Sequence, residues 1–154
     1  MVDLGAKFFT FNELTNSKSY PHIVQENRAD AMQYLRSAKK LAQLLDEIRE
    51  ILGAKPIQVN SGFRNAKLNK AVGSKSDNST HTKFEAVDIK PLNGLSIRDN
   101  FNKLLEAKKA GKLKNLRKVL EEGSWLHIEV ISDGTYYRGF FIGHNNNTRW
   151  EQVG

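Results

Sequence analysis

The sequence predicts an α+β protein in which a small antiparallel β-sheet packs against a long N-terminal helix and additional helices. Two observations lead to this prediction. One long amphipathic stretch precedes several short β-type runs, and the strands and helices alternate too irregularly for a repeated βαβ unit. A length of 154 residues with 39% hydrophobic content is that of one domain with its own core. We therefore expect residues 1–154 to form a single domain.

Helical periodicity appears in two parts of the chain. From about Asn27 to Leu52, apolar residues recur every three or four positions, which is the spacing of one face of an α-helix, and Gly53 ends the pattern. This stripe consists of Met32, Leu35, Ala38, Leu41, Leu45, Ile48 and Leu52. A second helical pattern runs from Ser96 to about Glu122 with a break near Gly111, and places Leu113, Leu116 and Leu120 on one side.

Short β-type runs bounded by Pro, Gly and polar residues predict the strands of the sheet. A brief helix near Asn65–Ala71 and a small polar loop, Gly73–Ser79, separate the first two of them. The predicted strands are Ile57–Asn60, Glu85–Ile89 and Trp125–Ile131, with a possible fourth, Tyr136–Ile142, beyond an Asp-Gly turn.

The strand Trp125–Ile131 separates two kinds of side chain by face. Because side chains alternate along a strand, Leu126, Ile128 and Val130 share an apolar face that must point into the core. The other face then carries Trp125, His127 and Glu129. Taken alone, this segment is explained equally well by a functional face or by a solvent-exposed face that happens to be polar.

A loop histidine and a strand aspartate add to this polar face. In the strand Glu85–Ile89, Asp88 lies opposite the core-facing positions, and His81 precedes it by 88 − 81 = 7 residues. Together with His127 they would form a set of two imidazoles and one carboxylate. Three protein ligands with a fourth position left for water is how catalytic zinc is held. The chain has no cysteine, so a metal could be held only by His and carboxylates, and disulfides and thiol nucleophiles are excluded.

The charge balance favours polyanionic partners. Lys and Arg number 24 against 17 Asp and Glu, a net charge of +7. The basic stretch Lys103–Lys118 lacks the interleaved aromatics of a nucleic-acid surface, so an anionic cell-envelope polymer is the better match. The N-terminus lacks the segments of a secretory signal, and no run approaches the about 18 apolar residues of a membrane span. We expect a monomer, made in the cytoplasm without a signal peptide and not inserted into membranes.

Four segments resemble one known family when taken in order. Ser79–Asp88 resembles the Ser-x-His-x-x-Gly-x-Ala-x-Asp motif of the zinc D-Ala-D-Ala carboxypeptidase family, which includes vancomycin-resistance dipeptidases and bacteriophage L-alanyl-D-glutamate endolysins. Asn60–Arg64 is similar to the Ser-Gly-Tyr-Arg segment of that family, and Trp125-Leu126-His127 is similar to the segment with its last zinc ligand. Phe9–Leu14 resembles the opening of short phage-type members, and the resemblance spans roughly residues 8–131.

The resemblance implies a hedgehog/D-Ala-D-Ala peptidase-like fold and a bound Zn²⁺. The implied zinc ligands are His81, Asp88 and His127. Arg64 would steady a substrate carboxylate or the developing oxyanion, for which its planar, permanently charged fork is suited. Ser79 would hydrogen-bond the substrate or a neighbouring side chain, and Trp125 would form a wall of the pocket.

Two positions depart from the family pattern. Phe84 replaces the motif glycine, which would crowd or reshape the pocket wall, and Ser124 stands where the family has an acidic base three residues before the last histidine. A hydroxyl cannot act as the base near neutral pH, so another carboxylate must do so. Glu129 is the first candidate, although it could equally be an outer partner that fixes a ligand histidine. Glu121 and Glu122 are the alternative bases.

The leading functional hypothesis is a zinc metallopeptidase that hydrolyses a peptide bond in the peptidoglycan stem peptide, as a phage endolysin that reaches the cell wall after release. The D-Ala-D-Ala and L-Ala-D-Glu specificities share these motifs, so the bond is left open. The alternative, prompted by Ser124, is a zinc-containing module without turnover that binds the cell wall or serves as a virion component. A nucleic-acid accessory protein is a third and weaker reading of the charge.

Overall fold

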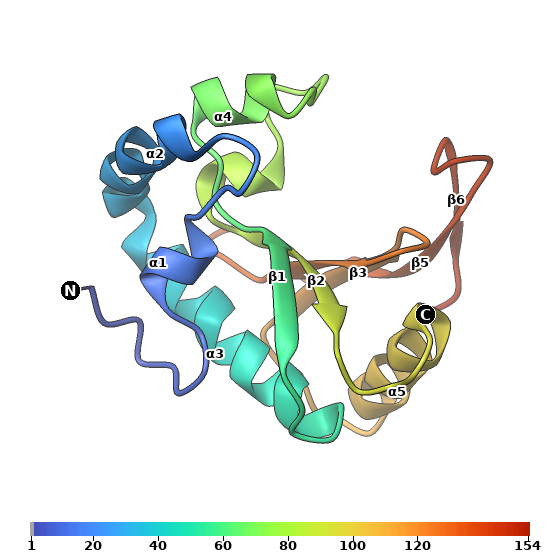
Figure 1. The fold of residues 1–154 in the computed structure, drawn as a ribbon. Coiled ribbons are helices and arrows are strands. Elements are labelled where there is room, and N and C mark those ends of the chain that lie inside the picture. The colour runs from blue at the N-terminus through green and yellow to red at the C-terminus, as the bar shows by residue number, and fades with distance from the viewer. Residues whose placement is uncertain (1) are drawn as a thin grey trace.

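Six strands form one sheet in the order β1-β2-β4-β3-β5-β6 in the computed structural model, which describes residues 2–154 (Figure 1). Neighbouring strands are antiparallel except β3 and β5, which run parallel because the chain leaves β4 and returns along the outer side of β3. The predicted α+β class is confirmed. The strands are β1 Ile57–Ser61, β2 Ala86–Pro91, β3 Leu116–Glu121, β4 Leu126–Val130, β5 Gly139–His144 and β6 Arg149–Gln152.

The long helical stretch predicted over Asn27–Leu52 is present as two α-helices joined by one 3₁₀ turn. The turn leaves Met32, a member of the predicted stripe, exposed. In the following helix the stripe residues Ala38, Leu41, Leu45 and Ile48 are buried, and Leu35 is half-buried. No helix within residues 2–154 is long and apolar enough to cross a membrane. The helices are α1 Phe11–Leu14, η1 Pro21–Ile23, α2 Val24–Ala31, η2 Met32–Tyr34, α3 Leu35–Ile51, α4 Ala66–Ala71, η3 Thr80–Lys83 and α5 Ile97–Lys109.

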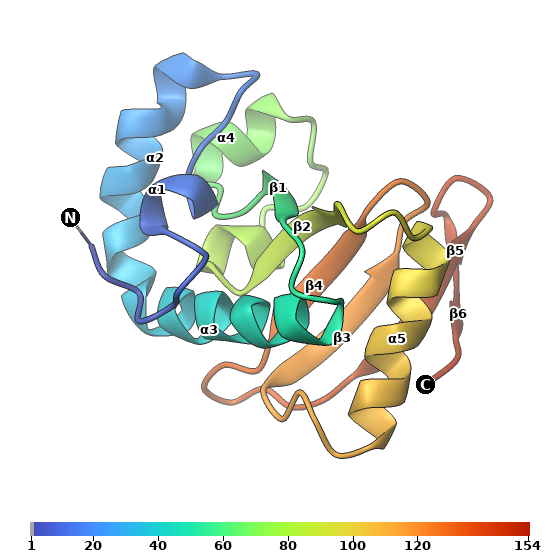
Figure 2. The same cartoon turned by 60° about the horizontal axis from the view of Figure 1, so that its bottom comes forward.

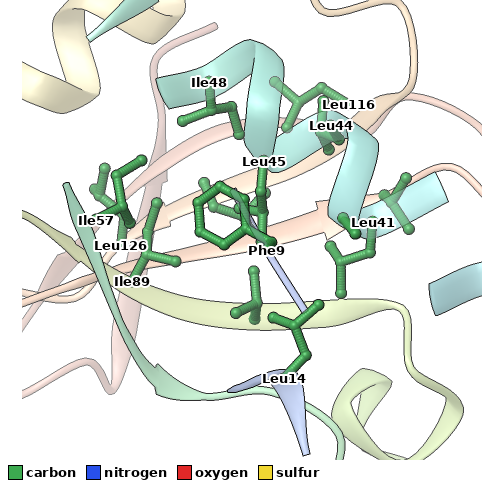
Figure 3. Close-up of a cluster of buried hydrophobic side chains, with 14 of the residues drawn as sticks. Phe9, Leu14, Leu41, Leu44, Leu45, Ile48, Ile57, Ile89, Leu116 and Leu126 are labelled. Atoms are coloured by element: carbon green, nitrogen blue, oxygen red, sulfur yellow. The ribbon is translucent and has the colours of Figure 1, made fainter. Parts of the chain in front are cut away.

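The hydrophobic core lies between the sheet and the two longest helices, α3 and α5 (Figure 2). Figure 3 shows Leu41, Leu45 and Ile48 of α3 in one cluster with Ile89 of β2 and Leu126 of β4. Burying one such side chain is worth roughly 1.5–3 kcal/mol. The core therefore fixes the strands β2 and β4 and leaves their opposite face for polar side chains.

The predicted helix over Ser96–Glu122 is wrong beyond Lys109. Leu116–Glu121 forms strand β3, and its pairing with β4 slips by one residue between Leu116 and Lys118. This bulge places Leu116 and Val119 both in the core at a spacing of three, which imitates helical periodicity. A period-two pattern interrupted by one extra residue was thus interpreted as a helix.

The C-terminal region contains one strand that was predicted and one that was not. The strand expected at Tyr136–Ile142 is present in part as β5. The edge strand β6 was missed because all four of its residues are exposed, so it lacks the apolar alternation that marks a half-buried strand.

Candidate metal centre

The polar face of β2 and β4 carries two side chains at the same height. Asp88 and His127 are directly paired across the two strands, while their neighbours Ile89 and Leu126 point into the core. The 3₁₀ turn η3 brings buried His81 over the same point. One possible ligand atom from each of these three residues lies within 4.8 Å of the others. The three residues singled out from sequence therefore form one cluster.

Hydrogen bonds fix the orientation of both imidazole rings. Asp88 contacts His127 Nδ1 through Oδ1 at 2.9 Å and His81 Nε2 through Oδ2 at 3.4 Å. The second ring nitrogens face away from the cluster. His81 Nδ1 lies 2.8 Å from the Gly62 carbonyl oxygen, and His127 Nε2 lies 2.8 Å from Glu129 Oε2. A carbonyl or carboxylate on the far nitrogen is the usual support of a metal-binding histidine.

The carboxylates of Asp88 and Glu129 favour positive charge at His127, whereas burial disfavours it at His81. Burial opposes protonation of His127, but its hydrogen bonds to Asp88 and Glu129 raise its pKa to about 9. Burial alone would raise the pKa of Asp88, yet the two imidazoles hold it well below its usual range. For His81, burial is the dominant influence and lowers the pKa. Two imidazoles and one ionised carboxylate are a donor set that suits Zn²⁺.

Glu129 lies behind His127 and is held there by several contacts. Arg117 Nη1 is 3.1 Å from Glu129 Oε1, and Thr80 Oγ1 donates to Oε2 at 3.2 Å. Burial opposes ionisation, but His127, Lys118 and Arg117 keep the pKa of Glu129 below its ordinary value. Glu129 is thus a buried, ionised carboxylate engaged with the outer side of the cluster.

A cleft of about 360 Å³ opens on the other side of the cluster. Three residues proposed from the sequence as substrate contacts, Arg64, Ser79 and Trp125, line it together with His81, Asp88 and His127. Among the three candidate bases, the structure places Glu122 in this lining. The polar face of the strands therefore leads directly into a solvent-accessible pocket.

The neighbouring acidic residues Glu121 and Glu122 point in different directions. Glu121 Oε2 pairs with Arg98 Nε of α5 at 2.6 Å, and its Oε1 accepts a hydrogen bond from the Gly123 amide at 3.0 Å. Burial and the nearby charge of Asp88 raise the pKa of Glu122. The indole N–H of Trp125 lowers the pKa of Glu122 against these two effects, although the two side chains form no hydrogen bond of ordinary geometry.

Arg64 reaches the cleft from the loop after β1. Its backbone amide donates to the His81 carbonyl at 3.0 Å, and its guanidinium contacts Ser61 Oγ at 3.3 Å and Ser79 Oγ at 3.5 Å. Burial lowers the pKa of Arg64. Among the described residues, the buried Nε of Arg64 and Nε1 of Trp125 have no hydrogen-bond partner.

The glycine before this arginine is required by close packing. A Cβ atom at Gly62 would collide with the Leu14 carbonyl oxygen, which also accepts the Phe63 amide at 2.8 Å. The Gly62 carbonyl oxygen in turn lies within hydrogen-bond distance of His81 Nδ1. The Ser-Gly-Phe-Arg segment therefore packs against the backbone at the end of α1 and at the same place contacts the histidine of the cluster.

The buried side chain of Asn27 in α2 holds the backbone on both sides of Arg64. Its Nδ2 donates to the carbonyls of Thr15 at 2.9 Å and Phe63 at 3.0 Å, and its Oδ1 accepts from the Asn65 amide at 2.7 Å. Sequence reasoning did not find Asn27, because nothing in a helical pattern marks a polar residue whose partners come from distant loops.

We expect Asn27→Ala to destabilise the fold by about 2–4 kcal/mol, because it leaves two buried carbonyls and one amide without partners. The free energy of unfolding in urea measures this loss. Asn102→Ala, on the exposed side of α5, is the matched control and should change it by less than about 0.5 kcal/mol. Equal stability of the two variants would contradict the assigned role of Asn27.

Phe84, which replaces the glycine of the resembled motif, occupies a left-handed backbone conformation with φ 59° and ψ 32°. Its ring is fully buried and stacks on Phe63 with centroids 5.3 Å apart. The side chain therefore enters the core instead of the lining of the cleft, and the expected crowding of the pocket wall is wrong. The left-handed conformation explains why glycine suits this position.

Two substitutions at position 84 should separate backbone strain from packing. We expect Phe84→Gly to cost about 2–4 kcal/mol of stability, since the loss of the buried ring exceeds the relief of strain. Phe84→Ala loses the same ring but keeps the strained conformation, so it should be less stable than Phe84→Gly by about 1 kcal/mol. Thermal or urea unfolding of the pair measures both effects. A more stable alanine variant would contradict the strain argument.

Comparison with protein families identifies one match. The family model described as Peptidase M15 matches residues 7–129, a range that contains the three-residue cluster and the lining of the cleft. A search of curated proteins found no match to the chain.

Proposed function

The chain belongs to the Peptidase M15 family, and on this premise we propose that it is a zinc metallopeptidase that hydrolyses a peptide bond in the stem peptide of peptidoglycan. The observation that supports this most strongly is the meeting of His81, Asp88 and His127 at the floor of a cleft. Arg64 and Glu122 line the same cleft and supply a permanent positive charge and a free carboxylate.

The residues of the cluster suit a zinc ion. His81 and His127 each turn one nitrogen toward Asp88, and their outer nitrogens are engaged by Gly62 and Glu129. When bound, Zn²⁺ would supply Lewis acidity, lowering the pKa of a coordinated water toward ~7 and polarising the scissile carbonyl.

We assign the general base to Glu122 and not to Glu129, the first candidate from sequence. Glu122 lines the cleft, and its raised pKa brings it closer to the working pH of a base. It accepts a proton from the attacking water and returns it to the departing amine. Glu129 instead holds the His127 ring by its outer nitrogen, which is the other role weighed for it.

The remaining cleft residues contact the substrate. The Arg64 guanidinium steadies the oxygen on which negative charge develops, or a substrate carboxylate, and Trp125 forms a wall of the same cleft. Ser79 Oγ, which accepts from Arg64 Nη2 at 3.5 Å, keeps that guanidinium at the edge of the cleft.

We further propose that the protein is a lytic enzyme, such as a phage endolysin, that acts on the cell wall after release. Its net charge of +7 suits an anionic envelope. The cut bond is D-Ala-D-Ala or L-Ala-D-Glu within the stem.

Digestion of purified sacculi with the zinc-loaded protein tests this function. We expect one equivalent of zinc by elemental analysis and one new pair of termini in the released muropeptides by mass spectrometry, which also identifies the bond. One equivalent of zinc without any new terminus would favour the wall-binding or virion module. Absence of both zinc and cleavage would refute the metallopeptidase.

A further inference from the structure

A second cavity, of about 550 Å³, adjoins the metal cleft. Arg64 and Val72 line both cavities, so these two side chains form the boundary between them. Pockets of about 300–1,000 Å³ are typical of small-molecule binding sites. The space available beside the cluster is therefore larger than the cleft alone.

Two segments of the chain form the walls of this cavity. One is the edge strand β1, where a bulge between Val59 and Ser61 displaces Asn60, and Gln58 Nε2 donates to Asn60 Oδ1 at 2.7 Å. Bulges are common beside functional sites, where they redirect a side chain. The other wall is the segment 16–19, which follows α1 and rises toward α4 (Figure 1). The Tyr20 hydroxyl ties this segment to α4 by donating to the Ala71 carbonyl at 2.8 Å.

The lining has the chemistry of a peptide-binding surface. Half of the twelve lining residues carry amide or hydroxyl groups, which can both donate to and accept from the backbone of a bound peptide. Lys18 and Arg64 add positive charge and Glu13 adds negative charge. These charges suit a peptide that carries both a carboxylate and an ammonium group beyond the bond at the metal cleft.

We propose that this cavity is a second substrate subsite, which binds the continuation of an extended, zwitterionic peptide past Arg64. The inference rests on the proposed function and makes it more specific, because it places the part of the stem peptide beyond the bond at the metal cleft in the cavity lined by Lys18, Glu13 and Gln58. A dipeptide held at the cleft leaves Lys18, Glu13 and Gln58 without substrate contacts, whereas a longer peptide engages them.

Binding titrations with three peptides test the subsite without turnover. The probes are the dipeptides D-Ala-D-Ala and L-Ala-D-isoglutamate and the pentapeptide L-Ala-γ-D-Glu-L-Lys-D-Ala-D-Ala, added to zinc-loaded Glu122→Gln protein in a calorimeter. We expect the pentapeptide to bind at least about tenfold more tightly than either dipeptide. The side-chain amide NMR signals of Gln58 and Asn60 should shift with the pentapeptide only.

A variant that blocks the second cavity tests whether the tighter binding of the pentapeptide arises there. Gln58→Trp introduces an indole at an exposed strand position of the cavity and should weaken pentapeptide binding about tenfold, with a smaller change for the dipeptides. Lys103→Trp places the same side chain on the exposed face of α5, in the lining of neither cavity, and should leave all three affinities unaltered.

The outcomes separate the subsite from the hydrolase. Equal binding of short and long peptides, or full pentapeptide affinity in Gln58→Trp, overturns the subsite even when the wild-type protein cleaves sacculi. Length-dependent binding that Gln58→Trp weakens supports the subsite even when the wild-type protein cleaves nothing, in which case the proposed hydrolase fails. No pentapeptide binding at all overturns the subsite.

Discussion

Asp88→Asn is expected to remove both bound zinc and hydrolysis. Asp88 is the single carboxylate of the cluster and contacts both histidines, one through each oxygen. An amide keeps the size of the side chain but removes the negative charge that offsets the metal. The loss of zinc affinity should exceed the roughly 10- to 100-fold cost of losing an outer partner of a ligand.

Zinc content after dialysis and the rate of sacculus cleavage measure this effect together. Asp133→Asn is the matched control, because Asp133 lies on the surface in an exposed ion pair with Arg36 and should leave both properties intact. An Asp88→Asn protein that retains one equivalent of zinc and normal turnover would show that the three-residue cluster is not the metal site.

The strand patterns explain why the cluster was predictable from sequence. In β4, alternation alone separates the core residue Leu126 from His127, and in β2 it separates Ile89 from Asp88. Both strands are regular where they pair, so a period of two carries directly to three-dimensional position. The position of His81 in the turn η3 does not follow from strand alternation; it was predicted from the spacing to Asp88 and from the family resemblance.

The features that were missed depend on contacts between distant segments. Glu121 pairs with the core-facing Leu126 at the end of β3, so strand alternation turns its side chain away from the cleft. Arg98 of α5 then holds Glu121 on that side, and this pairing could not be predicted while β3 was taken for a helix. The role of Asn27 likewise exists only once two loops have been folded around it. The strand β3 was lost for a local reason, since one bulge changes the apparent period of its apolar residues from two to three.

Glu122→Gln is expected to lower kcat by about 10²- to 10⁴-fold while zinc remains bound, the range that one general acid–base group supplies. Glutamine has nearly the same shape but cannot accept the proton of the attacking water near neutral pH. The metal should stay because Glu122 is not one of the three clustered residues. Stopped assays of peptide cleavage, together with zinc analysis of the same preparation, give both quantities.

Two matched variants distinguish the three candidate carboxylates. Glu121→Gln weakens the pair with Arg98 and should reduce stability with little change in kcat, since Glu121 faces away from the cleft. Glu129→Gln loses the charge behind His127 and should weaken zinc binding by about 10- to 100-fold. At saturating zinc the turnover of Glu129→Gln should recover. It would not recover if Glu129 were the general base. The opposite result would identify Glu129 as the base: loss of turnover in Glu129→Gln with zinc fully bound, and activity retained in Glu122→Gln. The proton of the attacking water would then go to the carboxylate behind the His127 ring and not to the one in the cleft.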